Sequence, residues 1–452
     1  MQDLQSIMET LSGLVWGPYM LVLIVGTGVF LTFRLLFWQF RMLPLAFKQV
    51  FGKHPNKKDS GDISQFASLM TALSATIGTG NIAGVATACV LGGPGAVFWM
   101  WMTALFGMAT KFGEGVLAVK YRHKNEKGEM NGGPMYYIER GLGPKWKWLA
   151  VLFALFGTLA SFGIGSSVQS NTVALAVENS LGIETWMTAI IITAFSALVI
   201  LGGIKTISKA SSVIVPIMAL GYVMGGLIII LNNLDLVMPA LKMIFTYAFT
   251  GEAAAGGAIG AAIRYGVARG VFSNEAGMGS APIAAAAAQT DHPVRQGLVS
   301  MTGTFLDTII VCSITGIVLV MGFIMAGNSF GEQTGAVLTI HVFDQLLPGF
   351  GGWVVTFGII FFAYSTILGW SYYGEKCCTY LLGEKSVLTY RIIYIASVFI
   401  GCVVTLDLVW LFADTFNGLM AAPNCIALLL LSGVIVKESK DFIARRKSGE
   451  LY

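Results

Sequence analysis

Long stretches without charge dominate the pattern of apolar and polar positions along this chain. No Asp, Glu, Lys, Arg or His occurs from Ile63 to Thr110, from Trp148 to Val177 or from Gln345 to Gly374. A membrane-spanning helix needs about 20 mainly apolar residues, so these blocks are too long for the buried helices of a soluble domain. The apolar runs predict eleven membrane-spanning helices. They cover residues 15–37, 66–91, 95–119, 148–177, 185–204, 211–231, 254–288, 298–326, 353–377, 389–411 and 413–436.

The loops between the expected spans differ in positive charge. Lys and Arg gather after the first, third, fifth, seventh and ninth spans and in the tail, whereas the opposite loops are nearly free of them, with Lys242 the main exception. Loops rich in Lys and Arg face the cytoplasm. We therefore expect a multi-pass protein of the plasma (cell) membrane, with its amino terminus outside and its carboxyl terminus in the cytoplasm. The basic tail at 437–452 is expected to lie near anionic headgroups.

Two of the expected spans contain glycine pairs that lipid-facing helices avoid. The second span carries Gly78 and Gly80, and the seventh carries Gly277 and Gly279. Glycine lets the backbone leave the helix, and unwound backbone at this depth is tolerated only where it lines an enclosed cavity or binds something. Close helix packing through small residues is the alternative explanation for each pair taken alone.

The two glycine pairs lie five spans apart, and this spacing predicts the fold. An odd number of spans per repeat gives the repeats opposite topology, which is the layout of inverted-repeat transporters. We predict an all-α integral membrane protein with about 11 transmembrane helices. One N-terminal extra helix precedes a five-plus-five inverted repeat with discontinuous first and sixth core helices. The expected segments are 1–65 (extra helix and cytoplasmic linker), 66–231 (first repeat), 232–436 (second repeat, with an external helix in 232–253 and a lid loop in 328–352) and 437–452 (cytoplasmic basic tail).

Composition narrows the possible function classes. Of 452 residues, 55% are hydrophobic and 12% are charged, about half the charged share of an ordinary soluble domain. The sequence has no GxxxxGK[ST] phosphate loop and no HExxH, and its six cysteines lack metal-binding spacing. The net charge of +4 is assigned to the cytoplasmic loops. We therefore expect a transporter rather than an enzyme, without a nucleic-acid partner or an obligate protein partner.

Three strings carry a resemblance to a known family: GTGNIAGVATA at 78–88, NGGPMYYIERGLG at 131–143 and RGVFSNEAGMGSAPIAAAAAQTDHPVRQGLVSM at 269–301. The chain resembles the alanine or glycine:cation symporter family, within the amino acid/polyamine/organocation superfamily, over nearly all of its length after the first span. The resemblance implies the five-plus-five fold and the import of alanine and glycine with a cation, usually Na⁺. The spacing alone indicates only a transporter of small solutes.

The two breaks predict where a zwitterionic substrate binds. The helix amino terminus after the first break offers free amides and a positive dipole end, which suit a carboxylate. These amides belong to Gly78, Thr79, Gly80 and Asn81. The substrate ammonium is expected at the other break, near Phe272, Ser273 and Asn274. The alternative for Asn81 is a helix cap inside the break.

Three more residues are candidates for the pocket wall. Met278 and Phe272 would narrow it and exclude large side chains by steric clash. Gln169 is costly to bury and is placed against the substrate, with interhelical hydrogen bonding as the alternative. Trp370 lies one turn beyond Thr366 and is expected to floor the pocket or act as a gate. Met278 and Trp370 could equally be ordinary packing residues.

The resemblance also implies a sodium site, because adjacent Ser and Thr hydroxyls in the ninth span match a sodium position that recurs across the superfamily. Hard cations favour carbonyl and hydroxyl oxygens. The expected ligands are the carbonyl oxygens of Ser74, Ile77 and Phe362 and the hydroxyls of Ser365 and Thr366. The alternative is that both hydroxyls bond to their own helix.

Charged residues inside spans are functional candidates by default. Asp307 aligns with a second sodium ligand in relatives of this fold, so Asp307, with Asn81 and Ser273, is a candidate second cation or proton site. Glu275 lies in the seventh-span break and could orient it or take a proton. Arg264 and Arg269 could pair with a carboxylate as a gate. Lys111 and Glu114 are spaced i, i+3 and could pair with each other.

These features together predict a secondary symporter that imports alanine and glycine with Na⁺ as the coupling ion, by alternating access. The partners would be the amino acid, Na⁺ and the lipid bilayer. The alternative is a proton-coupled or exchange-type amino acid transporter on the same fold, with Glu275 or Asp307 as the proton site. A channel is more distant, because no span shows a regular polar stripe. An intramembrane enzyme lacks a catalytic pair at mid-span.

Overall fold

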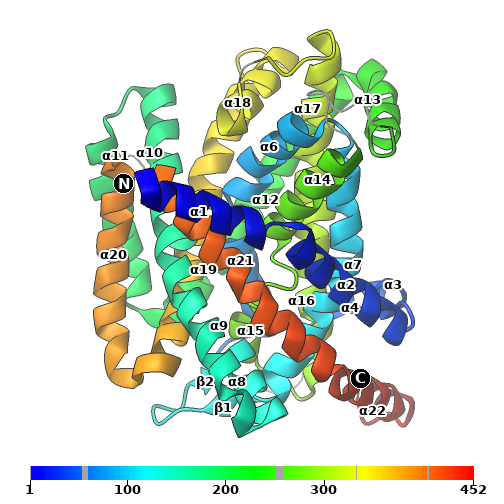
Figure 1. Ribbon diagram of the computed structural model, residues 1–452, viewed down its shortest axis with the longest axis vertical. Coiled ribbons are helices and arrows are strands. Elements are labelled where there is room, and N and C mark those ends of the chain that lie inside the picture. The colour runs from blue at the N-terminus through cyan, green and yellow to red at the C-terminus, as the bar shows by residue number, and fades with distance from the viewer. Residues whose placement is uncertain (1, 53–59, 251–258, 332, 405–406, 452) are drawn as a thin grey trace.

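The computed structural model is almost entirely helical (Figure 1). The structure describes residues 2–52, 60–250, 259–331, 333–404 and 407–451. The first elements are α1 (Gln2–Val15), α2 (Pro18–Arg34), α3 (Trp38–Arg41), α4 (Leu43–Phe51), α5 (Gln65–Thr76), η1 (Thr79–Asn81), α6 (Ala83–Gly92), α7 (Ala96–Lys120), β1 (His123–Lys124), β2 (Met130–Asn131), α8 (Pro134–Tyr137), η2 (Ile138–Leu142), η3 (Pro144–Trp146), α9 (Lys147–Ala160), η4 (Ser161–Ser167) and α10 (Val168–Leu181). The rest are α11 (Thr185–Ile200), α12 (Gly203–Asn232), α13 (Leu234–Tyr247), α14 (Ile259–Asn274), α15 (Ala281–Ala286), α16 (Pro293–Thr304), η5 (Phe305–Cys312), α17 (Ser313–Met325), α18 (Gly335–Leu346), α19 (Gly351–Leu382), η6 (Glu384–Ser386), α20 (Val387–Val403), α21 (Asp407–Leu430) and α22 (Ser432–Lys447).

Among the described residues, six helical segments are individually long and apolar enough to cross a membrane. The bent pair α21 and α22 would raise this number to seven. Two of the expected spans, 66–91 and 254–288, are divided into shorter helices, and α11 has only 16 residues. Residues 254–258 of the seventh expected span lie outside the described residues. The chain is therefore a multi-pass helical membrane protein, and the count of eleven stays a prediction.

The helix α19 lies at the centre of the packing. It spans 32 residues and contacts α5, α9, α10, α12 and α18. Close approach to α5 is allowed by Gly369, where an added β-carbon would lie 2.7 Å from the backbone nitrogen of Ala75. This contact brings the hydroxyls of α19 beside the carboxyl end of α5.

Both glycine pairs coincide with backbone that is not α-helical. Helix α5 ends at Thr76, and α6 begins at Ala83 after the single turn η1. Helix α14 ends at Asn274, and α15 begins at Ala281. Glu275, Gly277 and Gly279 all have positive φ, at 53°, 91° and 83°. A left-handed conformation suits glycine but is uncommon for glutamate, so the contacts of Glu275 must hold this turn in place.

The short elements divide between the two ends of the helix bundle. Helices α13 and α18, from the intervals 232–253 and 328–352, lie at the upper end in Figure 1. The hairpin of β1 and β2, in which His123 pairs with Asn131, lies at the lower end with α8. The basic tail forms most of α22, which bends by 58° away from α21. The helix boundary falls at Leu431, earlier than the expected tail start at 437.

Candidate substrate and sodium site

The first break is held by a side chain from within it. The amide oxygen of Asn81 accepts a hydrogen bond from the backbone N–H of Gly78 at 2.9 Å, and the N–H of Asn81 donates to the Gly78 carbonyl at 3.2 Å. Two of the four amides expected to bind the carboxylate are thus engaged inside the loop. The amides of Thr79 and Gly80 are the better candidates. Asn81 has the capping contact that the alternative explanation described.

The second break is held from three sides. The Glu275 carboxylate accepts hydrogen bonds from Trp370 Nε1 at 3.1 Å and from the Ser280 hydroxyl at 2.5 Å. On the other side of the turn, Glu114 Oε1 on α7 accepts the N–H of Gly277 at 3.1 Å. Hydrogen bonds from α7, from α19 and from the loop itself therefore stabilise the left-handed turn.

Asn424 on α21 completes the support of the second break. Its amide nitrogen donates to Glu114 Oε1 at 2.7 Å and to the Gly277 carbonyl at 2.8 Å. The hydroxyl of Tyr137 bonds to its amide oxygen. An unwound backbone buried in a membrane protein needs such partners, because no lipid group can satisfy its N–H and C=O.

The two breaks lie against each other. A β-carbon on Gly80 would lie 3.2 Å from the Phe272 ring and 3.4 Å from the α-carbon of Ser273. From α10, Gln169 donates to the Thr79 hydroxyl at 3.4 Å, and its amide oxygen is buried without a hydrogen-bond partner. That oxygen would lie 3.6 Å from a β-carbon on Gly78. A buried amide oxygen without a donor at this position suits a substrate ammonium.

Asp307 joins the two breaks through its side chain. Its Oδ1 accepts the Asn81 amide at 2.7 Å, and its Oδ2 accepts the hydroxyls of Ser273 at 3.0 Å and Thr308 at 2.8 Å. It is completely buried in η5, a π-helical stretch between α16 and α17. Cys312 lies 3.3 Å from the Asn81 nitrogen and 3.2 Å from the Ser273 oxygen. Such π-helical stretches often occur at functional sites.

The five oxygens expected to bind sodium converge between α5 and α19. The Ser365 hydroxyl lies 3.2 Å from the carbonyl oxygen of Ser74 and 2.9 Å from that of Phe362. The Thr366 hydroxyl lies 3.5 Å from the Ile77 carbonyl oxygen and 2.9 Å from that of Phe362. Each hydroxyl bonds to its own helix and also faces the break, so the oxygen set fits a hard monovalent cation.

The structure places some predicted residues elsewhere. Met278 is fully buried in an apolar cluster with Ile24 of α2 and Cys425 of α21, among other residues. Asn274 directs its amide nitrogen to the Thr308 hydroxyl at 3.2 Å and its oxygen to the N–H of Ala276. Trp370 contacts Glu275 rather than the first break. Within the part of the chain that the structure describes, the hydrogen bonds of Asn274 and Trp370 and the apolar cluster of Met278 do not include Gly78 or Gly80.

The sequence analysis did not predict four residues that form hydrogen bonds in or beside the breaks. They are Glu114, Thr308, Cys312 and Asn424. Glu114 was noticed as a charge inside a span, but as a partner for Lys111. That pair is wrong as a direct contact, since Lys111 makes no hydrogen bond or ion pair with any described residue. Asn424 could have been found from the sequence, because an amide side chain in an apolar span needs hydrogen-bond partners.

Residues 1–451 match the sequence profile of the sodium:alanine symporter family. The chain belongs to this family. The resemblance seen in the three sequence strings is confirmed, and the chain is an amino acid transporter of the membrane rather than an enzyme.

Relatives in the sodium:alanine symporter family cover the full length of the chain. The sodium/alanine symporter AgcS of Methanococcus maripaludis is 58% identical over 448 residues, which is 99% of each chain. An uncharacterized transporter of Haemophilus influenzae is 55% identical, covering 98% of this chain and 97% of its own. The probable sodium/glutamine symporter GlnT of Bacillus subtilis is 40% identical, covering 99% of this chain and 93% of its own.

Solved structures with a similar fold have little sequence identity to this family member. The structure of MhsT in complex with L-phenylalanine has a TM-score of 0.60 at 13% identity and covers 84% of this chain and 93% of its own. A manganese transporter of Eremococcus coleocola, mutant E129A, has a TM-score of 0.53 at 11% identity, covering 84% of this chain and 82% of its own. These similarities concern the fold, which is shared with inverted-repeat transporters.

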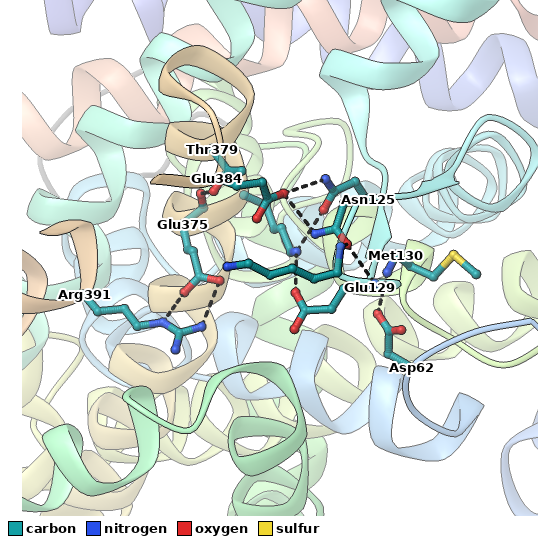
Figure 2. A network of polar contacts seen from close by, with 11 residues as sticks. Asp62, Asn125, Glu129, Met130, Glu375, Thr379, Glu384 and Arg391 are labelled. Carbon is teal, nitrogen blue, oxygen red and sulfur yellow. Dashed lines mark hydrogen bonds and ion pairs between the residues drawn. The ribbon is translucent and has the colours of Figure 1, made fainter. Parts of the chain in front are cut away.

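A second polar network of this symporter-family chain lies around the β1–β2 hairpin (Figure 2). Lys376 near the end of α19 donates to Asn131 at 2.9 Å and lies 3.6 Å from Glu129. Glu375 binds Arg391 of α20 through two contacts of 2.6 and 3.2 Å. The network therefore ties the end of α19 to both the hairpin and α20.

The same hairpin also contacts the segment before α5. The carboxylate of Asp62 accepts the N–H of Met130 at 2.8 Å, and Asn125 donates to Glu384 at 2.9 Å (Figure 2). Asp62 donates its own N–H to the Ala287 carbonyl, just after α15. Segments that flank both breaks are thereby joined at the hairpin end.

At the opposite side of the breaks, Arg269 on α14 pairs with a carboxylate. It lies 3.8 Å from Asp414 of α21 and 5.4 Å above the Phe272 ring. The expected partner was Glu275, Asp307 or another carboxylate, and the structure selects Asp414. Arg264 instead lies over the ring of Tyr265.

Proposed function

We propose that this protein is a secondary symporter that imports alanine and glycine, coupled to Na⁺, by alternating access. The observation that carries the proposal is the convergence of the hydroxyls of Ser365 and Thr366 on three carbonyl oxygens beside the first break. The same break supplies the amides proposed for the substrate carboxylate. Ion and substrate would then stabilise one another's geometry, and this coupling must be reciprocal.

The substrate would bind between the two breaks. Its carboxylate is assigned to the amides of Thr79 and Gly80, with Gly78 and Asn81 shaping the loop. Its ammonium is assigned to the free amide oxygen of Gln169 and to backbone around Phe272 and Ser273. The contact of Phe272 with Gly80 leaves little depth for a side chain, which supports a preference for glycine and alanine. The name of AgcS agrees with this class, whereas that of GlnT names glutamine.

Asp307 and Glu275 are proposed as a second position for a cation or a proton. Asp307 contacts both breaks through Asn81 and Ser273, and Glu275 forms part of the second break. This arrangement supports the alternative of a proton-coupled transporter on the same fold.

The proposed transport cycle uses eleven spans, with the amino terminus outside and the carboxyl terminus in the cytoplasm. The fold of MhsT and the two opposed breaks support a five-plus-five repeat. The hairpin network would close the cytoplasmic end, because it joins the segments before α5 and after α15. Opening to the cytoplasm would then require its contacts to part.

Uptake of labelled L-alanine into proteoliposomes tests the proposal, with Na⁺ and pH gradients imposed separately. A Na⁺ gradient alone should drive accumulation, unlabelled glycine should compete, and excess glutamine should compete weakly. Accumulation that follows the pH gradient and ignores Na⁺ would establish the proton-coupled alternative. Single-channel currents would establish a channel.

A further inference from the structure

Lys111 is a buried cation without a direct partner among the residues that the structure describes. It lies in the middle of α7, is 3% exposed, and makes no hydrogen bond or ion pair with any residue that the structure describes. A charge buried in a membrane protein is costly unless other charges or polar groups compensate for it. The surroundings of Lys111 therefore have to explain why its charge is kept.

One source of compensation is a small cavity that Lys111 lines, together with several polar side chains. The cavity lies between α5, α7, α14, α15 and α16, and its volume is about 10 Å³. This is room for about one water molecule and not for an amino acid. Its polar lining comes from Ser68, Thr76, Asn274, Gln296 and Ser300. The amide oxygen of Gln296 is buried without a hydrogen-bond partner, so a water there could accept from Lys111 and donate to Gln296.

The second source is a group of three buried carboxylates. Glu114 lies one turn beyond Lys111 on α7, and Asn274, which lines the same cavity as Lys111, precedes Glu275 and bonds to Thr308, the neighbour of Asp307. Lys111 is therefore near all three carboxylates without a hydrogen bond or ion pair to any of them, and its charge favours their ionised forms. Glu114 and Glu275 hold the second break, and Asp307 joins it to the first. With all three ionised, one ammonium leaves this region short of positive charge. Each further cation that binds at the breaks reduces this deficit.

We propose that the Lys111 ammonium is a built-in counter-cation that sets the number of sodium ions bound with the substrate. Its fixed positive charge compensates for the carboxylates around the breaks. Without it, a second sodium ion at Asp307 and Glu275 would be needed to compensate for them. The native protein therefore needs one sodium ion, at Ser365 and Thr366, and the second position proposed at Asp307 and Glu275 takes no sodium ion while Lys111 is charged. Lys111 contacts neither ion nor substrate and acts through the carboxylates. This inference rests on the proposed Na⁺-coupled function.

Removal of the charge should create a requirement for a second sodium ion. The Hill coefficient for Na⁺ in alanine uptake is expected to be about 1 in the native protein and in Lys111→Arg. In Lys111→Met, which keeps the length of the side chain, it should rise toward 2. In the double variant Lys111→Met/Glu114→Gln, which removes one negative charge as well, it should return toward 1. A lysine needed only for packing would not give this pattern.

Equilibrium binding of ²²Na⁺ to the purified protein gives an independent count, with one ion per native protein and two per Lys111→Met expected. Should Lys111→Met fail to fold, Glu114→Gln alone provides the test. It lowers the negative charge around the breaks by one and should weaken the apparent Na⁺ affinity severalfold.

Three results would overturn the inference about Lys111 alone: a native Hill coefficient near 2, an unchanged coefficient in folded Lys111→Met, or an unchanged Na⁺ affinity in Glu114→Gln. A fourth is a loss of uptake when gluconate replaces chloride, which would assign Lys111 to an anion site. Alanine uptake that is independent of Na⁺ in the native protein would instead contradict the proposed function itself.

Discussion

The hydroxyl of Thr366 lies 3.5 Å from the carbonyl oxygen of Ile77, a residue 289 positions earlier in the chain. Ile77 is the first residue beyond α5, and Thr366 lies within α19. The contact joins the unwound backbone of the first break to the central helix of the fold. Binding of a cation here would hold α5 against α19, which gives the ion a direct influence on the break.

Replacement of Thr366 by alanine removes one of the five oxygens proposed for Na⁺. Bonds to charged groups contribute about 1.5–3 kcal/mol, so the apparent Na⁺ affinity of alanine uptake should fall about 10- to 100-fold. Ser371→Ala is the matched control, because among the described residues the Ser371 hydroxyl bonds only to the Leu368 carbonyl of its own helix. An equal loss of Na⁺ affinity in both variants would show that Thr366 does not bind the ion.

A methyl group at Gly78 should block the site by steric overlap. The added β-carbon would lie 2.5 Å from the Thr366 hydroxyl oxygen, between the break and α19. Overpacking of this kind costs about 1–3 kcal/mol, so uptake by Gly78→Ala should fall about 5- to 150-fold. In Gly84→Ala, on α6, the new carbon meets nothing within 4 Å, and uptake should stay near the native rate. Native uptake by Gly78→Ala would show that this contact does not matter.

Loss of the Asn424 side chain should destabilise the second break. Asn424→Ala removes donors to Glu114 and to the Gly277 carbonyl, and an unsatisfied buried group costs about 1–3 kcal/mol. A lower unfolding temperature in detergent is therefore expected. A double-mutant cycle with Glu114→Gln should give a coupling of about 0.5–3 kcal/mol. Strict additivity of the two changes would mean that the bond contributes nothing.

Disruption of the hairpin network should favour the state open to the cytoplasm. Glu375 and Arg391 are 6% and 17% exposed at their side chains, and breaking a buried pair costs about 3–5 kcal/mol. In Glu375→Gln, a cysteine introduced at Ser211 of α12 should react severalfold faster with a thiol reagent. Glu139→Gln breaks the partly exposed pair with Lys147. Pairs near the surface contribute about 0–1 kcal/mol, so the rate should stay unchanged. Slower labelling in Glu375→Gln would contradict the proposed closure.

The sequence located much of the site because its signals are local. Glycine pairs mark places where the backbone leaves the α-helix, and residues 77–82 and 275–280, which are not α-helical, contain Gly78, Gly80, Gly277 and Gly279. The adjacent hydroxyls of Ser365 and Thr366 were found in the same way. Their convergence on α5 was expected from the resemblance, and the structure supplies its distances.

The sequence failed where the direction of a side chain decided the outcome. Met278 lies in the Gly-Met-Gly turn as its number requires, but the positive φ of both flanking glycines turns it toward α2 and α21. Lys111 and Glu114 have the spacing of a helical pair, but Glu114 is taken by Gly277 and Asn424. Spacing along one helix cannot reveal a stronger partner that another segment supplies.

By itself, the sequence determined that this chain spans a lipid bilayer. It also determined the family of the chain and the places where its helices are interrupted. The spans and the breaks follow from local composition, because each is a property of a short window, whereas the family follows from the resemblance of three sequence strings. Only the tertiary structure decided which distant groups meet: Asn81 with Asp307 across 226 residues, and Glu114 with Asn424 across 310. The physical reason is that a buried polar group takes the partner that folding brings within hydrogen-bonding distance, and that choice depends on how the helices pack.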